Sequence, residues 1–330
     1  MSATPLLEPV PTVPVASAIR GDSVRAGDKW FRRLSAGAGV LVLVIMAAIA
    51  LFLVWKAAPA LRANTVNFFT TQDWSPDTTG AAAFGIAALA FGTIISSVIA
   101  MTLAVPVGFG IALFISHYAP RRLATLLGYI VDLLAAVPSI IFGLWGLQFL
   151  MPHSIGLMQW LNDHLGFISL FRNTTGLYTR SLAIASIVLA IMILPTVSAI
   201  SREVFNQVPR AHIEAALALG ATRWEMVRTA IFPFGRPGMI SAAMLGLGRA
   251  LGETIAVALL ISPAFRISWH ITDPGGTTFA SNIALKWGDA GTIGLGALIA
   301  SGLVLFIITL LVNMAARIII ERRREFSGAN

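Results

Sequence analysis

Two charged residues interrupt the segment GLGRALGETIAVALLI, residues 246–261, which is otherwise apolar enough to belong to a membrane span. Arg249 and Glu253 are four residues apart, so they share one face of a continuous helix. Charges at membrane depth are costly and usually face protein or a water-filled cavity. Two interpretations follow. The charges form an ion pair that supports packing, or the planar guanidinium of Arg249 lies on a path for an oxyanion.

Small residues accompany the two charges. Gly246, Gly252 and Ala256 are expected on the same face or at its edges, where they leave room for a neighbouring helix or a lumen. Counted from a span that starts near Pro237, Arg249 lies roughly 18 Å into the bilayer, near its middle. This face is therefore expected to point toward protein or water rather than lipid.

The composition assigns the chain to the membrane. Of its 330 residues, 57% are hydrophobic and 12% are charged, a balance typical of membrane proteins. The sequence has no cysteine, which excludes disulfides and cysteine-ligated metals, and its five histidines are too scattered for a metal site. The net charge of +8 is expected to reflect basic cytoplasmic loops, and nucleic acid is not an expected partner.

Hydrophobic runs predict an all-α integral membrane protein with six transmembrane helices, because about 20 apolar residues cross a bilayer. The expected spans are 34–58, 84–116, 123–150, 182–200, 238–261 and 291–319. The expected surroundings are a flexible tail at 1–33, an external loop at 59–83, a five-helix core within 84–319 and a C-terminal tail at 320–330. A short interfacial helix is expected within 157–167, where Trp160 and Phe167 suit the lipid headgroups.

Basic residues predict the orientation. If the N-terminus is cytoplasmic, the opposite side holds only Lys56, Arg62, Arg172, Arg180, Arg266 and Lys286, and most other basic residues fall on the cytoplasmic side. A multi-pass protein with both termini in the cytoplasm is therefore expected. Asp132 lies near the cytoplasmic start of the third span, beyond Arg121 and Arg122, and is expected either to pair at the interface or to act in gating.

The segment between the fourth and fifth spans, about 202–236, is longer than a helix connection requires. Pro209 suits the start of a helix, residues 210–219 favour one, and Gly220 suits its C-terminal cap. A second helix is expected from about Thr222 toward Pro233.

The first of these two helices has an apolar face made by Ile213, Ala216 and Leu217. Such a helix docks in the groove of a partner protein or lies on lipid. The residues alone leave both interpretations open.

Residues 214–234, EAALALGATRWEMVRTAIFPF, resemble the EAA signature of the permease subunits of bacterial ABC importers. The chain matches the signature's Glu-Ala-Ala, glycine and proline at Glu214, Ala215, Ala216, Gly220 and Pro233. It departs at Ala230 and Phe232, where the signature has isoleucine and leucine. The resemblance implies a type I ABC importer permease fold. It also implies that a cytoplasmic coupling helix, here Glu214, Ala215, Ala216, Leu217 and Gly220, sits in a cleft of an ATPase subunit.

Two further motifs, GLGRALGETIAV and AAVPSIIFGLWGL (135–147), resemble the PstC type of phosphate permease. The resemblance covers roughly residues 84–317. It implies that Arg249 and Glu253 lie on a pathway for inorganic phosphate across a bacterial inner membrane. It also implies the other components of such a complex: a homologous PstA permease, two copies of the ATPase PstB, the external phosphate-binding protein PstS and membrane lipid. The sister PstA subunit and a relative carrying another tetrahedral oxyanion remain alternatives.

A nucleotide-binding loop of the form Gly-x-x-x-x-Gly-Lys-Ser/Thr is absent from the sequence. ATP and its magnesium are therefore expected on the partner ATPase, with no cofactor and no enzymatic activity in this chain. Two rival classes remain to be tested. An autonomous carrier or channel would need no EAA loop, and a membrane enzyme would need catalytic groups that converge at one surface.

Overall fold

The computed structural model describes residues 26–78 and 80–324. In that part of the chain, six helices are long and apolar enough to cross a membrane: Lys29–Ala63, Ala87–Tyr118, Ser139–Leu165, Leu182–Asn206, Arg223–Gly252 and Thr292–Ile318. The expected all-α, six-span organisation is thus confirmed. Most of the tails predicted at 1–33 and 320–330 lies outside the described residues, but 26–33 and 320–324 are helical.

The described residues divide into two units, with the boundary between Phe52 and Leu53. Helix α1 (Ala26–Ala63) begins in the first unit. There its apolar side chains, among them Trp30, Leu41 and Phe52, are exposed, as expected of a membrane-spanning helix in an isolated chain.

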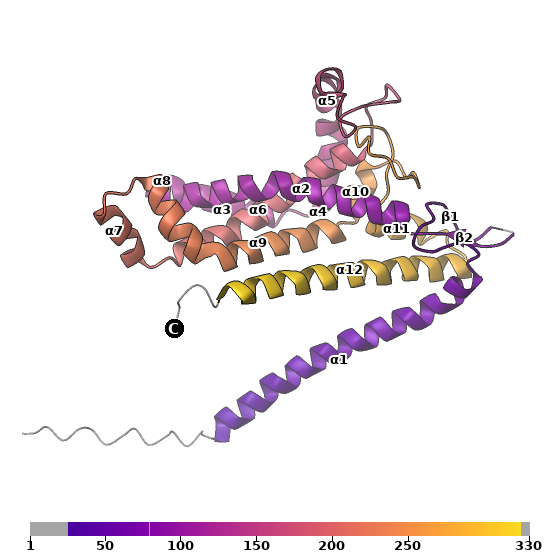
Figure 1. Cartoon of the computed structure of the whole chain (residues 1–330). Helices are drawn as coiled ribbons and strands as arrows, with labels where there is room; N and C mark the ends of the chain where they lie inside the picture. Colours follow the sequence, from indigo (N-terminus) through magenta and orange to yellow (C-terminus); the bar gives the residue numbers. More distant parts are fainter. Residues whose placement is uncertain (1–25, 79, 325–330) are drawn as a thin grey trace, which may run out of the picture. The chain divides into compact units, whose positions relative to one another are not determined.

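The second unit is built around three helices that pack on one another, α2 (Ala87–Leu113), α6 (Leu182–Asn206) and α9 (Phe232–Gly252). Helix α3 (Arg121–Ala135) packs on α6, and α12 (Thr292–Arg324) packs on α9 (Figure 1). Small residues allow the close approach of α2 and α6. A β-carbon at Gly108 would lie 3.0 Å from Val197 Cγ1, and Ala100 and Ala104 are buried.

The third span differs from its prediction. After α3 ends at Ala135, a new continuous helix of 27 residues runs from Ser139 to Leu165. It consists of α4 (Ser139–Trp145), the π-helical turn η2 (Gly146–Leu150) and α5 (Met151–Leu165). The prediction of a span at 123–150 with a separate interfacial helix at 157–167 is therefore wrong. The physical reason is Pro138, which disfavours helical conformation in the residue before it and here caps the new helix.

The fifth span also differs. Helices α8 (Arg223–Met226), the π-helical turn η3 (Val227–Ile231) and α9 form one helix of 30 residues, so the expected break at Pro233 is absent. The π-helical turn ends two residues before Pro233 and widens the helix near the position where the proline lacks an N–H donor. The helix then ends at Gly252, and a separate short helix, α10 (Ile255–Leu260), follows. The single span predicted at 238–261 is wrong for this reason.

Part of the loop predicted at 59–83 forms regular secondary structure. Strands β1 (Trp74–Ser75) and β2 (Ala83–Phe84) form an antiparallel pair near α11 (Phe279–Lys286) (Figure 1). In the same loop, the Asp77 carboxylate accepts the backbone N–H groups of Gly291 and Gly294 at 2.9 and 2.8 Å. This side chain therefore satisfies donors at the start of α12 that have no partner within the helix.

The opposite end of the bundle carries α7 (Arg210–Ala218) and α8 (Figure 1). There, Phe205, Val208, Met226 and Val227 form a buried apolar cluster with the C-terminal end of α2, which continues as the π-helical turn η1 (Phe114–Tyr118). This cluster fixes α7 and the turn after it to the ends of the central helices.

Candidate coupling helix and membrane-embedded polar site

Helix α7 ends in a glycine turn whose hydrogen bonds are all local. Gly220 has φ +83°, a conformation that residues with a β-carbon rarely adopt. Its N–H donates to the Leu217 carbonyl at 3.0 Å, and the N–H of Ala221 donates to the Ala216 carbonyl at 3.2 Å. This is the Schellman pattern of a helix C-terminus. The predicted glycine cap is confirmed.

The next helix begins with an equally local cap. The Thr222 hydroxyl accepts the N–H of Glu225 at 3.3 Å, and the Glu225 carboxylate accepts the N–H of Thr222 at 2.8 Å. This reciprocal pair is a capping box. Together the two caps hold the turn between α7 and α8 in one conformation.

The two sides of α7 differ in exposure. Ile213 and Ala216 pack on the buried cluster of residues 205–231. Leu217 and Leu219 are 44% and 89% exposed, so the expected apolar face is divided: Ile213 and Ala216 pack on the bundle, and Leu217 stays exposed. Because α7 turns its inner side to its own bundle, the exposed outer side with Glu214, Ala215 and Leu217 is the part available to a partner.

Asp132 forms an ion pair between α3 and α6. Both of its carboxylate oxygens accept from Arg202 Nη2, at 3.0 and 3.1 Å. The Arg202 side chain passes over Gly128, where a β-carbon would lie 2.5 Å from Nη1. The ion pair expected of Asp132 is present. Its partner was not identified from the sequence, because Arg202 is 70 residues away.

Arg249 and Glu253 do not share a helix face. Glu253 follows the last residue of α9 with φ −67° and ψ 126°, and its carboxylate accepts the N–H of Ala256 at 3.2 Å in the first turn of α10. Among the described side chains, the one ion pair within 4.0 Å joins Arg202 to Asp132. The predicted placement of the two charges at i and i+4 of one helix is wrong, and so is the ion-pair alternative in this structure.

Arg249 instead contacts α6. Its Nη1 donates to the Thr196 hydroxyl at 3.3 Å. Since the helix of Arg249 begins at Arg223 rather than near Pro237, counting from Pro237 does not measure its depth. Thr196 supplies a better reference. It lies in the middle of the 25-residue α6, about 21 Å from Leu182 and about 15 Å from Asn206.

The two motifs that carried the resemblance pack against each other. A β-carbon at Gly143 of α4 would lie 2.8 Å from the Ala256 α-carbon, and one at Gly146 would lie 3.0 Å from Leu260 Cδ2. These glycines let α4 approach α10 closely, in parallel. The start of α4 therefore lies level with the break between α9 and α10. This contact was not predicted, because each motif by itself gives no indication of its partner.

The small residues near Arg249 divide between two environments. Gly246 is buried, and a β-carbon there would lie 2.8 Å from Val197 Cγ2. Ala256 is buried against α4. Gly248 and Gly252 have open space at their β-carbon positions. The expected single face of small residues is thus wrong, because the helix break turns Ala256 toward α4 while Gly252 stays exposed.

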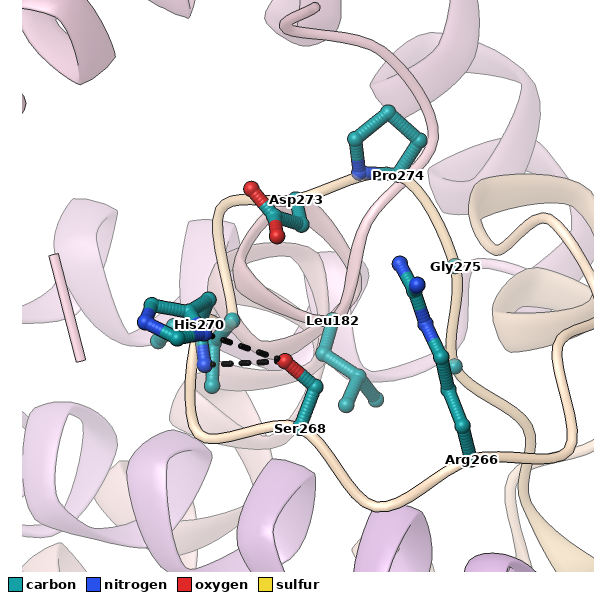
Figure 2. Close-up of a pocket in the computed structure, with 9 residues that line it drawn as sticks. Leu182, Arg266, Ser268, His270, Asp273, Pro274 and Gly275 are labelled. Atoms are coloured by element: carbon teal, nitrogen blue, oxygen red, sulfur yellow. Dashed lines mark hydrogen bonds between the residues drawn. The ribbon is translucent and has the colours of Figure 1, made fainter. Parts of the chain in front are cut away.

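A small pocket lies in the loop after α10 (Figure 2). Arg266, Ser268, His270 and Asp273 line it, and the N–H of His270 donates to the Ser268 hydroxyl at 3.2 Å. Its volume is about 10 Å³, space for roughly one water molecule. The Asp273 carboxylate also accepts the hydroxyl and N–H of Thr174, at 2.6 and 2.8 Å. This pocket is too small for a tetrahedral oxyanion. The bonds between Asp273 and Thr174 instead join the loop after α10 to the loop before α6.

The six apolar helices of the described chain are those of a multi-pass membrane protein. The family model of the binding-protein-dependent transport system inner membrane component matches residues 104–325. The chain is 47% identical to phosphate transport system permease protein PstC 2 of Mycobacterium tuberculosis over 93% of this chain and 96% of that protein. It is 47% identical to PstC of Mycobacterium leprae over 93% and 97% of the two chains, and 41% identical to PstC of Xylella fastidiosa over 91% and 93%.

The chain therefore belongs to the family of binding-protein-dependent transport inner membrane components, and within it to the PstC permeases. This membership excludes the autonomous carrier and the membrane enzyme as classes for the chain, and it decides against the sister PstA subunit. As an ABC transporter permease subunit, the chain is not itself the ATPase.

Proposed function

We propose that this chain is the permease subunit through which an importer moves inorganic phosphate across the bacterial inner membrane. A separate ATPase drives the transport. The printed names of the relatives support phosphate as substrate. The observation that carries the proposal is the position of Arg249, whose guanidinium lies at mid-length of α6 and has no carboxylate within ion-pair distance among the described side chains.

This arrangement suits phosphate. At neutral pH phosphate carries one or two negative charges. The planar guanidinium offers several N–H donors, whose fork matches the spacing of phosphate oxygens. Glu253 lies one step beyond the end of α9, where its carboxylate can accept a hydrogen from a protonated phosphate oxygen. A negative charge near the site also weakens anion binding, which transport requires because a tightly held ion does not leave.

The α7 end supplies the coupling. The exposed side of α7, with Glu214, Ala215 and Leu217, would sit in a cleft of the ATPase PstB, and the turn at Gly220 would transmit its motion to the long helix that ends beside Arg249. Because ATP is cytoplasmic, α7 and both termini would face the cytoplasm, as the basic residues predict. A homologous PstA subunit, two PstB copies and the external protein PstS would complete the complex. Binding of PstB to inside-out vesicles, but not to right-side-out vesicles, tests this orientation.

The Asp132–Arg202 pair is proposed to take part in gating. It joins α3 to α6 near the end of the bundle that carries α7, and 50% of the Asp132 side chain is exposed. A pair at such a position opens at low cost when the helices move.

The test is the Arg249→Gln variant in the complete complex, reconstituted in vesicles with internal ATP. We expect phosphate uptake to fall at least about a hundredfold, since the variant loses a charged hydrogen-bonding group that meets the substrate. Assembly and basal ATP hydrolysis should persist. The matched control is Arg266→Gln, an arginine of the small loop pocket, which should transport normally. Uptake by Arg249→Gln at the control rate would refute the pathway.

A further inference from the structure

We propose that Thr196 is a positioning residue, which holds the Arg249 guanidinium in the orientation that receives the substrate oxyanion. The inference rests on the proposed function, because it assigns Thr196 a role only through Arg249.

The hydrogen bond of Thr196 differs from those of three other hydroxyl residues of the spans. The hydroxyls of Thr102, Ser186 and Ser198 donate to carbonyls of their own helices, three or four residues earlier, which is the common local pattern. The Thr196 hydroxyl instead accepts from Arg249 Nη1 across the interface between α6 and α9. Its bond therefore serves the neighbouring helix.

The packing around Val197 fixes this contact. Val197 lies between two glycines, because β-carbons at Gly108 of α2 and Gly246 of α9 would lie 3.0 and 2.8 Å from its two methyl groups. The α6 and α9 backbones consequently approach each other closely beside Thr196. Gly246 is one turn before Arg249, so buried packing sets the separation of the α6 and α9 backbones beside Thr196 and Arg249.

A neutral partner is chemically appropriate here. A carboxylate would orient the guanidinium but would also neutralise its charge, whereas a hydroxyl orients it and leaves the charge available to an anion. The guanidinium has five N–H donors. Among the described residues, Thr196 is its one hydrogen-bond partner, so the remaining donors are free to bind a tetrahedral oxyanion.

The experiment compares Thr196→Val, which keeps the shape but removes the acceptor, with Thr196→Ser, which keeps the hydroxyl. Both are measured in the reconstituted complex with saturating phosphate-loaded binding protein. We expect Thr196→Val to lower the maximum uptake rate about tenfold, the effect of losing one hydrogen bond to a charged group, and Thr196→Ser to retain most of it. The concentration of binding protein at half-maximal uptake should not change. Thr102→Val, an exposed Thr→Val change in α2, is the matched control and should behave as wild type.

The melting temperature of the complex separates positioning from structure. Equal uptake by Thr196→Val and wild type would overturn the inference. So would a parallel loss of uptake and melting temperature in both Thr196 variants, because the hydroxyl would then have no specific role. If Arg249→Gln abolishes uptake while Thr196→Val transports normally, the positioning role fails and the proposed function stands. If Arg249→Gln transports normally, the proposed pathway itself fails.

Discussion

The turn after α7 and the break between α9 and α10 are both helix ends, but different forces produce them. At the first, Gly220 and the Thr222–Glu225 capping box satisfy the backbone with residues at most five positions apart. At the second, α10 is held by the glycine face of α4, and Gly143 is more than a hundred residues before Ala256 in the sequence. The first end is therefore capped by neighbouring residues, whereas the second adds a tertiary contact with α4 to the local bond between Glu253 and Ala256.

The difference explains which helix ends could be predicted. Glycine and threonine caps are short-range signals, and they predicted the α7 turn correctly. Between Arg249 and Ile261 the sequence has no proline and is apolar apart from Arg249, Glu253 and Thr254, so an unbroken helix was predicted. The break after Gly252 turns Glu253 away from the face of Arg249. Because the sequence predicted no break there, it predicted Glu253 instead of Thr196 as the neighbour of Arg249.

Gly220→Val should give the largest effect among changes at these two ends. A left-handed conformation costs a residue with a β-carbon about 1–2 kcal/mol, and a β-branched residue is especially unfavourable there. We expect ATP-driven phosphate uptake to fall at least about tenfold, because that energy displaces the α7 turn. Gly220→Asn is the control, since asparagine tolerates this conformation, and should retain most uptake. Normal uptake by Gly220→Val would show that this turn does not couple the ATPase to the spans.

Glu253 should give an intermediate effect that separates its two roles. Glu253→Gln keeps an oxygen for the Ala256 N–H but removes the charge, whereas Glu253→Ala removes both. We expect Glu253→Gln to lower uptake several-fold at unchanged melting temperature. Glu253→Ala should also destabilise the protein by about 1 kcal/mol through loss of the cap. Thermal unfolding and vesicle uptake measure the two quantities, and equal melting temperatures in the two variants would exclude the capping role.

Asp132→Asn should give the smallest effect. The pair with Arg202 is partly exposed, and such pairs contribute about 0–1 kcal/mol. We expect basal ATP hydrolysis in the absence of binding protein to rise about twofold, with uptake nearly unchanged, since a weak pair of this size shifts a conformational equilibrium only slightly. High salt should raise wild-type hydrolysis in the same direction because it screens the pair. Unchanged hydrolysis in the variant would mark the pair as a surface contact without a role in gating.

The spans themselves were largely predictable, because apolar runs of membrane length have few alternatives. The predicted bounds of the third and fifth spans differ from the observed ones near prolines. Pro138 ends one helix and starts another, whereas Pro233 lies inside a continuous helix after a π-helical turn. A proline's position in the sequence does not distinguish these outcomes, because surrounding helices decide whether its missing hydrogen bond is tolerated.

The candidate site was predicted in part. Arg249 stood out by its charge in an apolar run, but Thr196 is 53 residues earlier and belongs to a common residue type for spans. The adjacent Pro195 gives no information about a contact with α9.

The Asp77 contact has a consequence for the order in which the protein is made. The Asp77 carboxylate accepts hydrogen bonds from the N–H groups of Gly291 and Gly294, which are 214 and 217 residues later in the chain. During synthesis, Asp77 in the hairpin of β1 and β2 therefore has no partner until the start of α12 has been made. A chain truncated before α12 has a complete sequence for this hairpin and its loop but no partner for Asp77. The end of the bundle that carries this hairpin is thus completed only after the other five spans of the described chain have been made.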